Sequence, residues 1–125
     1  MSTFRKGSAL VVLVALVALV AAVSAFGGSA QQTATTTVAV TAGKPAEFRL
    51  TLSKKTILKG TGVFKVTNKG KISHNFKIAG KKTPSLTAGK VSTLRVIFTK
   101  AGKYPYLCTL PGHAAAGMKG VLVVK

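Results

Sequence analysis

Residues 103–125 read KYPYLCTLPGHAAAGMKGVLVVK, and the rest of the chain is organised around this stretch. It contains Cys108, His113 and Met118, with four residues between each neighbouring pair, and His74 lies upstream in the run SHNF. The whole chain has one cysteine, two histidines and two methionines, and one of those methionines is the initiator. Every soft or borderline metal-binding side chain after the first residue therefore belongs to one set, and this predicts a metal site.

The set comprises one thiolate, two imidazoles and one thioether, which are the ligands of a blue-copper electron-transfer site. Cu(I) favours sulfur ligands and Cu(II) favours imidazole, so a rigid His₂Cys plane with a weak methionine contact suits both states. The ligands of one copper ion would then be His74, Cys108, His113 and Met118. In the competing interpretation, His74 is a hydrogen-bonded core histidine and Met118 packs in the core of an ordinary loop connection.

The loop between Cys108 and Met118 has the turn residues that such a site requires. Pro111-Gly112 predicts a turn just before His113, which would direct the imidazole back toward the cysteine sulfur. Residues 114–116 are alanines that could form about one helical turn, and their small side chains allow close approach.

Upstream of this loop, short segments alternate apolar and polar residues with a period of two, and turn formers such as Asn68-Lys69-Gly70 separate them. This pattern is typical of an antiparallel β-sandwich or barrel. The alternating positions are Val38 and Val40, then Phe48, Leu50 and Leu52, then Phe64 and Val66, then His74, Phe76 and Ile78, then Leu94, Val96 and Phe98. Their parity predicts an inward His74 on one strand and Cys108 on another strand, and residues 26–37 are expected to be a tether or frayed end.

The charge is lopsided, with 19 lysines and arginines against a single acidic residue, Glu47, and a formal net charge of +18. One carboxylate cannot form the pair that glycoside hydrolysis needs or the oxygen cage that Ca²⁺ needs. A Cys/His nucleophile is disfavoured because no acidic residue is expected near either histidine to orient it. Basic residues scattered among strands with few aromatics do not favour nucleic-acid binding. We therefore predict that the chain is not an enzyme and binds no nucleic acid.

Residues 1–30 have the features of an export signal: a basic start at Arg5 and Lys6, an apolar run from Leu10 to Val23, and small residues after it. The alternative is an uncleaved membrane anchor formed by residues 8–26, which are near the lower limit of about 20 for a span. Residues 31–125 would form one copper-binding domain, exported to the periplasm or the extracellular face of the membrane.

The motifs S-H-N-F at 73–76 and G-K-Y-P-Y-L-C-T-L-P-G-H-A-A-A-G-M-K-G at 102–120 resemble those of the cupredoxins, the small blue-copper proteins. The resemblance covers roughly residues 36–125 and implies an all-β, Greek-key β-sandwich of eight or a similar number of strands. It also implies one type 1 copper ion held by the four residues named above. Asn75 would brace the site and shield the thiolate. An apolar docking patch around His113 would consist of Leu110, Pro111, Ala114 and Ala115.

The chain departs from plastocyanin-like cupredoxins in the gap between cysteine and histidine, which has four residues instead of the usual two. The resemblance implies an exported one-electron carrier that cycles Cu(II) and Cu(I). We expect a monomer that serves redox partner proteins with an acidic docking surface. The alternatives are a protein that buffers or delivers copper, and a basic module that adheres to anionic membrane or cell-wall surfaces.

Overall fold

The computed structural model describes residues 33–125, which form nine β-strands and, within that range, no helix. In chain order the strands are β1 (Ala34–Ala42), β2 (Leu50–Leu52), β3 (Thr56–Ile57), β4 (Gly60–Asn68), β5 (Lys77–Ile78), β6 (Lys81–Lys82), β7 (Val91–Phe98), β8 (Gly102–Leu107) and β9 (Lys119–Val124). They build a four-stranded sheet in the order β2-β1-β4-β7 and a five-stranded sheet in the order β3-β9-β8-β5-β6.

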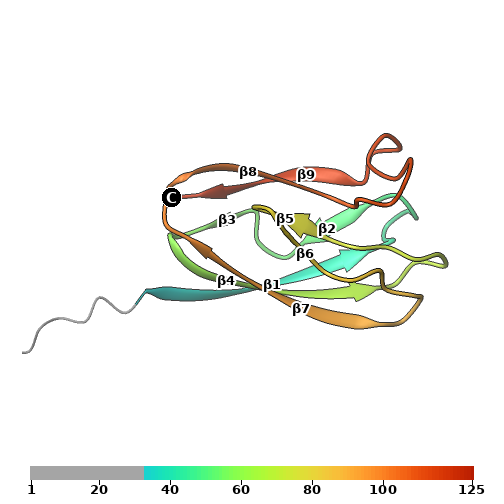
Figure 1. Ribbon diagram of the computed structural model, residues 1–125, viewed down its shortest axis with the longest axis horizontal. Helices are drawn as coiled ribbons and strands as arrows, with labels where there is room; N and C mark the ends of the chain where they lie inside the picture. The colour runs from blue at the N-terminus through green and yellow to red at the C-terminus, as the bar shows by residue number, and fades with distance from the viewer. Residues whose placement is uncertain (1–32) are drawn as a thin grey trace, which may run out of the picture. The chain divides into compact units, whose positions relative to one another are not determined.

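The chain crosses between the two sheets after β2, β3, β4, β6 and β7, so strands that are adjacent in sequence often lie in different layers (Figure 1). Two pairings are parallel, β1 with β4 and β3 with β9, and the other strand pairs are antiparallel. This arrangement confirms the predicted all-β, Greek-key sandwich.

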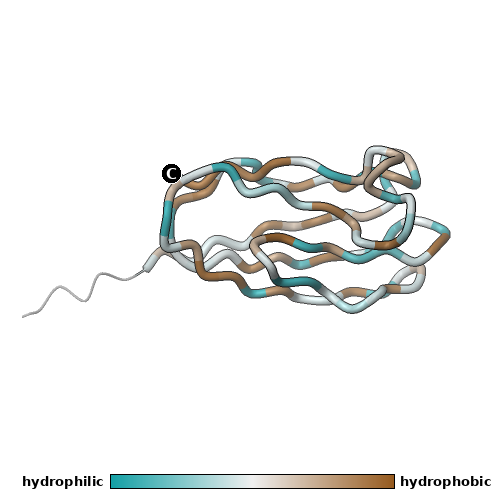
Figure 2. Tube along the Cα trace, turned by 45° about the horizontal axis from the view of Figure 1, so that its top comes forward, coloured by the Kyte–Doolittle hydropathy of each residue, from teal (hydrophilic) through white to brown (hydrophobic). Residues whose placement is uncertain are grey.

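The core lies between the sheets, where alternate residues of each strand point inward. Along β4 the side chains of Phe64 and Val66 are fully buried, whereas Lys65 between them is exposed. Figure 2 shows hydrophobic and hydrophilic residues alternating along the strands. Burial of a large apolar side chain stabilises a fold by about 1.5–3 kcal/mol, so this alternation fixes the register of the strand. The other fully or nearly fully buried apolar residues include Val38, Val40, Phe76, Ile78, Val96, Phe98, Tyr106, Leu122 and Val124.

Some segment boundaries differ from the sequence prediction. His74 does not lie in a regular strand but forms an isolated bridge with Leu86, through hydrogen bonds of 3.0 and 2.8 Å. Cys108 follows β8 directly, because the β8–β9 ladder ends at the pair Leu107 and Lys119. The predicted tether was wrong for residues 34–37, which pair with β4 as part of β1. Both His74 and Cys108 thus lie outside the regular strands.

The signal or anchor predicted for residues 1–30, including the apolar segment 8–26, lies outside the described residues. Across residues 33–125, we find no helix with the length and apolar character needed to cross a membrane.

Candidate metal centre

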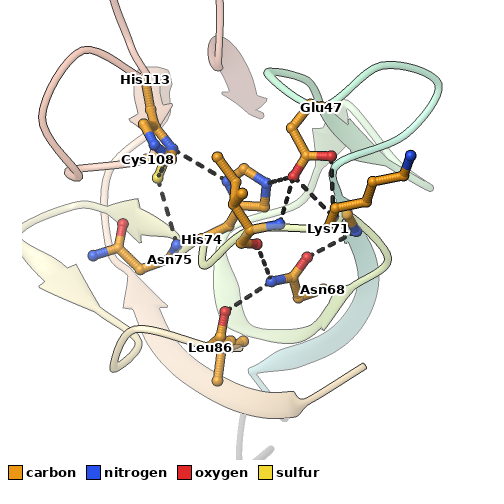
Figure 3. A network of polar contacts seen from close by, with 10 residues as sticks. Glu47, Asn68, Lys71, His74, Asn75, Leu86, Cys108 and His113 are labelled. Carbon is orange, nitrogen blue, oxygen red and sulfur yellow. Dashed lines mark hydrogen bonds and ion pairs between the residues drawn. The ribbon is translucent and has the colours of Figure 1, made fainter. Parts of the chain in front are cut away.

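Three of the predicted ligands converge at one end of the sandwich. One nitrogen each of His74 and His113 and the sulfur of Cys108 all lie within 4.8 Å of one another. The Nδ1 atoms of the two histidines are 3.2 Å apart, and His113 Nδ1 is 3.5 Å from Cys108 Sγ (Figure 3). Residues that are distant along the chain therefore present two nitrogens and one sulfur to a common point.

Cys108 is fully buried at the start of the loop that follows β8. Its backbone N–H donates to the carbonyl oxygen of Met118 (3.1 Å), which closes the base of the loop. The backbone N–H of Asn75 points at the cysteine sulfur at 3.5 Å, so the residue after His74 contacts the sulfur directly.

Asn75 joins the two segments that carry the ligands, as the resemblance implied. Its side-chain amide donates to Thr109 Oγ1 at 2.6 Å, and its Oδ1 accepts a hydrogen bond from the Thr109 backbone N–H at 2.7 Å. Because Asn75 follows His74 and Thr109 follows Cys108, these two bonds fix the imidazole segment against the thiolate segment. Asn75 is itself 4% exposed, so water competes little for these bonds.

The loop between Cys108 and Met118 folds into a compact turn around His113. The His113 N–H donates to the Leu110 carbonyl and the Met118 N–H donates to the His113 carbonyl, both at 3.1 Å. Gly112 adopts a φ of 79°, which few side chains tolerate, and this confirms the predicted turn at that position. Met118 is fully buried in a small apolar cluster with Cys108 and Ala42, next to the converging ligand atoms.

His113 lies at the edge of the site and is half-buried. Burial lowers the pKa of this imidazole, and the neighbouring His74 lowers it further. The ring of Phe48 contacts it edge-on, with the ring centroids 5.0 Å apart. Phe48 was expected to lie in a strand with Leu50 and Leu52, and that prediction was wrong. Phe48 is 37% exposed because β2 starts only at Leu50, so Phe48 belongs to the preceding loop.

Glu47 is the residue that the sequence analysis missed. Its Oε1 lies 2.8 Å from His74 Nε2, so the expectation that no acid lies near a histidine was wrong. Hydrogen bonds from the backbone N–H groups of Ile72 and Lys71 lower the pKa of Glu47 to about 2, against the opposing effect of burial and with help from His74. The only signal in the sequence was that Glu47 is the sole acidic residue, which does not say where its loop folds.

The contact with Glu47 orients the His74 ring. An ionised carboxylate only accepts hydrogen bonds, so this contact requires an Nε2–H on His74, and the other ring nitrogen, Nδ1, faces His113. With metal–nitrogen bonds of about 2.0 Å, two nitrogens around a trigonal ion would lie roughly 3.5 Å apart. The observed 3.2 Å is close to that spacing. The residues present therefore fit a soft or borderline metal ion.

The chain belongs to the family of the cupredoxin-like domain, whose sequence model matches residues 10–124. Among solved structures it resembles rusticyanin from Thiobacillus ferrooxidans, with 26% identity over 73% of this chain and 77% of that one, at a TM-score of 0.63. It also resembles auracyanin A, a "blue" copper protein from Chloroflexus aurantiacus, with 19% identity over 74% of this chain and all of that one, at a TM-score of 0.58. A third similar fold is reduced auracyanin from Roseiflexus castenholzii, with 24% identity, coverage of 73% and 96%, and a TM-score of 0.52. No match was found among curated proteins.

These findings confirm the predicted family and fold. They also confirm the predicted cofactor type, because the four residues form the pattern of a type 1 copper site. That pattern consists of His74, Cys108, His113 and Met118.

Proposed function

We propose that this protein is a one-electron carrier whose single copper ion is held by four side chains, those of His74, Cys108, His113 and Met118. The observation that carries this proposal is the convergence of a buried cysteine sulfur and two imidazole nitrogens within 4.8 Å. Copper bound there would supply reversible one-electron chemistry between Cu(II) and Cu(I). Electron transfer rather than enzymatic catalysis is then the function of the chain.

The surrounding residues are suited to hold the ligand atoms still while the charge changes. The Asn75 side chain ties the Cys108 segment to the His74 segment, and the loop to Met118 is closed by its own backbone hydrogen bonds. A site that does not rearrange adds little reorganisation to electron transfer. This rigidity favours a carrier over a protein that must open to release its metal.

We further propose that redox partners dock at the loop end of the sandwich, around the half-buried His113. The expected apolar contact consists of Leu110, Pro111, Ala114 and Ala115, and the exposed edge of Phe48 adds to it. The neighbouring loops bring cationic residues to the same end, among them Arg49, Lys69 and Lys71. Such a surface suits weak encounters with an acidic partner, and salt would weaken the attraction.

For residues 1–30 we keep the prediction of an export signal or an anchor formed by residues 8–26, followed by a copper-binding domain at 31–125. Export would place the carrier in the periplasm or on the extracellular face of the membrane, where it would act as a monomer. The basic surface is also suited to loose association with anionic membrane or cell-wall surfaces.

The test is copper titration of the purified protein, followed by voltammetry. The proposal predicts an intense blue colour that saturates at one Cu(II) per chain, together with a reversible one-electron wave. A blue protein without a reversible wave would favour a copper buffer or delivery protein instead. A protein that stays colourless with stoichiometric Cu(II) would refute the copper site.

A further inference from the structure

We propose that Glu47 is the positioning residue of the metal centre, which holds His74 in its metal-binding tautomer and lowers the reduction potential of the bound copper. This inference rests on the proposed function and deepens it. It assigns a specific role at the site to the only acidic side chain of the chain.

The first support is the contact itself, between residues that are 27 positions apart in sequence. Glu47 lies in the loop between β1 and β2, and His74 lies in the connection between β4 and β5. Figure 3 shows the two side chains pointing toward each other. Their side chains meet at 2.8 Å, with the His74 side chain 0% exposed and the Glu47 side chain 28% exposed. The far nitrogen of the ring is thus occupied by a fixed acceptor, and the near nitrogen is left free for the metal.

The second support is that the carboxylate is fastened to the same loop that carries the histidine. Glu47 Oε1 accepts from the backbone N–H groups of Lys71 at 2.9 Å and Ile72 at 3.0 Å, and Oε2 accepts from Lys71 at 3.0 Å. The fully buried Asn68 holds that loop from below: its amide donates to the carbonyls of Ile72 at 2.8 Å and Leu86 at 2.7 Å. The carboxylate therefore has little freedom to leave the imidazole.

The third support is the backbone at Gly70. A Cβ atom at this position would lie 2.5 Å from Glu47 Oε1 and 2.9 Å from His74 Nε2, both too close for a real contact. The Gly70 N–H donates to Asn68 Oδ1 at 2.8 Å, which keeps the backbone in place. Only glycine leaves room for the carboxylate and the imidazole to meet there.

The effect on potential follows from charge. Reduction adds one electron to the centre, Cu(II) + e⁻ → Cu(I), and removes one unit of positive charge. A fixed carboxylate against a ligand ring stabilises the more positive oxidised state, whereas the 19 lysines and arginines of the chain favour the reduced state. Glu47 is the only side-chain carboxylate that opposes this cationic field, and it contacts the ring of His74 directly at 2.8 Å.

Two substitutions separate charge from position. In Glu47→Gln the amide oxygen can still accept from His74 Nε2, so the tautomer should persist while the negative charge is lost. In Glu47→Ala both are lost. We expect each variant to shift the Cu(II)/Cu(I) equilibrium at least about tenfold toward Cu(I), equivalent to a rise of about 59 mV for a one-electron couple. Lys44→Gln is the matched control, because it removes one charge from the same loop without touching His74.

The readouts are the potential of the copper-loaded protein and the ¹⁵N chemical shifts of the His74 ring in the copper-free protein. We expect Nε2–H in the native protein and in Glu47→Gln, and a mixture of tautomers in Glu47→Ala. Potentials of both Glu47 variants no different from that of Lys44→Gln would overturn the effect on potential. A native His74 protonated on Nδ1 would overturn the positioning role, whether or not copper binds. A native protein that stays colourless would instead refute the proposed function and the potential effect with it.

Discussion

The two halves of the metal centre are built in different ways. Cys108, His113 and Met118 come from one continuous loop, and backbone hydrogen bonds within that loop set its shape. His74 instead depends on side chains from outside its own segment: Glu47 contacts its ring, and Asn68 at the end of β4 donates to the carbonyls of Ile72 and Leu86. The continuous half can be identified from residue spacing alone, whereas the assembled half depends on tertiary contacts. The same difference predicts which property of the protein is lost when residues of each half are substituted.

Substitution of the thiolate should have the largest effect, because nothing else in the chain can replace it. We expect Cys108→Ser to lose the blue colour completely, since a hydroxyl oxygen does not provide the soft ligand that produces it. The fold should survive, because the change in size is small and the loop hydrogen bonds are made by the backbone. Visible absorption with Cu(II) and circular dichroism measure the two effects. Thr109→Ser, next to it in sequence, is the control that should remain blue.

Loss of Asn68 tests the assembled half. Asn68→Ala would leave the carbonyl of Ile72 and the N–H of Gly70 without their partner, and the carbonyl of Leu86 would keep only its hydrogen bond from the His74 N–H. Unsatisfied buried polar groups cost about 1–3 kcal/mol each, so we expect a loss of roughly 3 kcal/mol in the free energy of unfolding.

Urea unfolding of the copper-free Asn68→Ala protein provides the measurement. The exposed neighbour Lys69 is the control, since Lys69→Ala should change stability by no more than about 0.5 kcal/mol. Equal losses in the two variants would mean that the loop before His74 does not need its buried amide.

These two halves also show how far the sequence could predict the molecule. Alternation along strands correctly predicted that Phe64 and Val66 are buried and that His74 points inward, because side-chain parity is a local property. The ligand loop was predictable because its residue types and turn formers are contiguous. The bracing role of Asn75 was inferred from the resemblance to the cupredoxins, and its hydrogen bonds to Thr109 agree with that inference.

The errors occurred where loops from separate strands meet. Phe48 kept the parity of β2 but lies outside the strand, against His113. Glu47 is next to it in the same loop, and its approach to His74 depends on the packing of Gly70 and Asn68. Such contacts depend on how two loops pack against each other, and no periodic pattern in either loop encodes that packing. A lone acid in a basic chain could have drawn attention, but not to a particular partner.

Asn75 links the two halves, so its substitution should destabilise both the His74 segment and the Cys108 segment. Asn75→Ala removes both hydrogen bonds to Thr109, and we expect a loss of about 2 kcal/mol in the free energy of unfolding. The companion Thr109→Val removes only the side-chain partner and should lose less. A double-mutant cycle between the two positions measures their coupling. Strictly additive losses would show that the amide and the threonine do not act together.

The smallest expected effect is the pH dependence of stability in the copper-free protein. The pKa of Glu47 falls from its ordinary 4.5 to about 2 on folding, so the unfolded chain takes up the proton first as the solution is acidified. The stability that Glu47 contributes is therefore complete above about pH 4.5 and is lost as the pH falls toward 2. The pKa of His113 is lowered on folding, so the unfolded chain takes up this proton first as well. The free energy of unfolding therefore also starts to fall when the pH drops below 6.5, the ordinary pKa of histidine.

Because Glu47 is the only side-chain carboxylate, Glu47→Gln should remove the loss of stability between about pH 4.5 and 2. The loss of stability that begins below pH 6.5 should remain. Urea midpoints measured between about pH 2 and 7 would show this, and Lys44→Gln is expected to keep both losses. Any other group that titrates in this range is common to all three proteins and cancels in the comparison. If Glu47→Gln loses stability below pH 4.5 as steeply as the native chain, the carboxylate is not held by its loop as the distances indicate. The His74 half of the centre would then be held less firmly than the Cys108 half, because the contact between Glu47 and His74 would not be fixed.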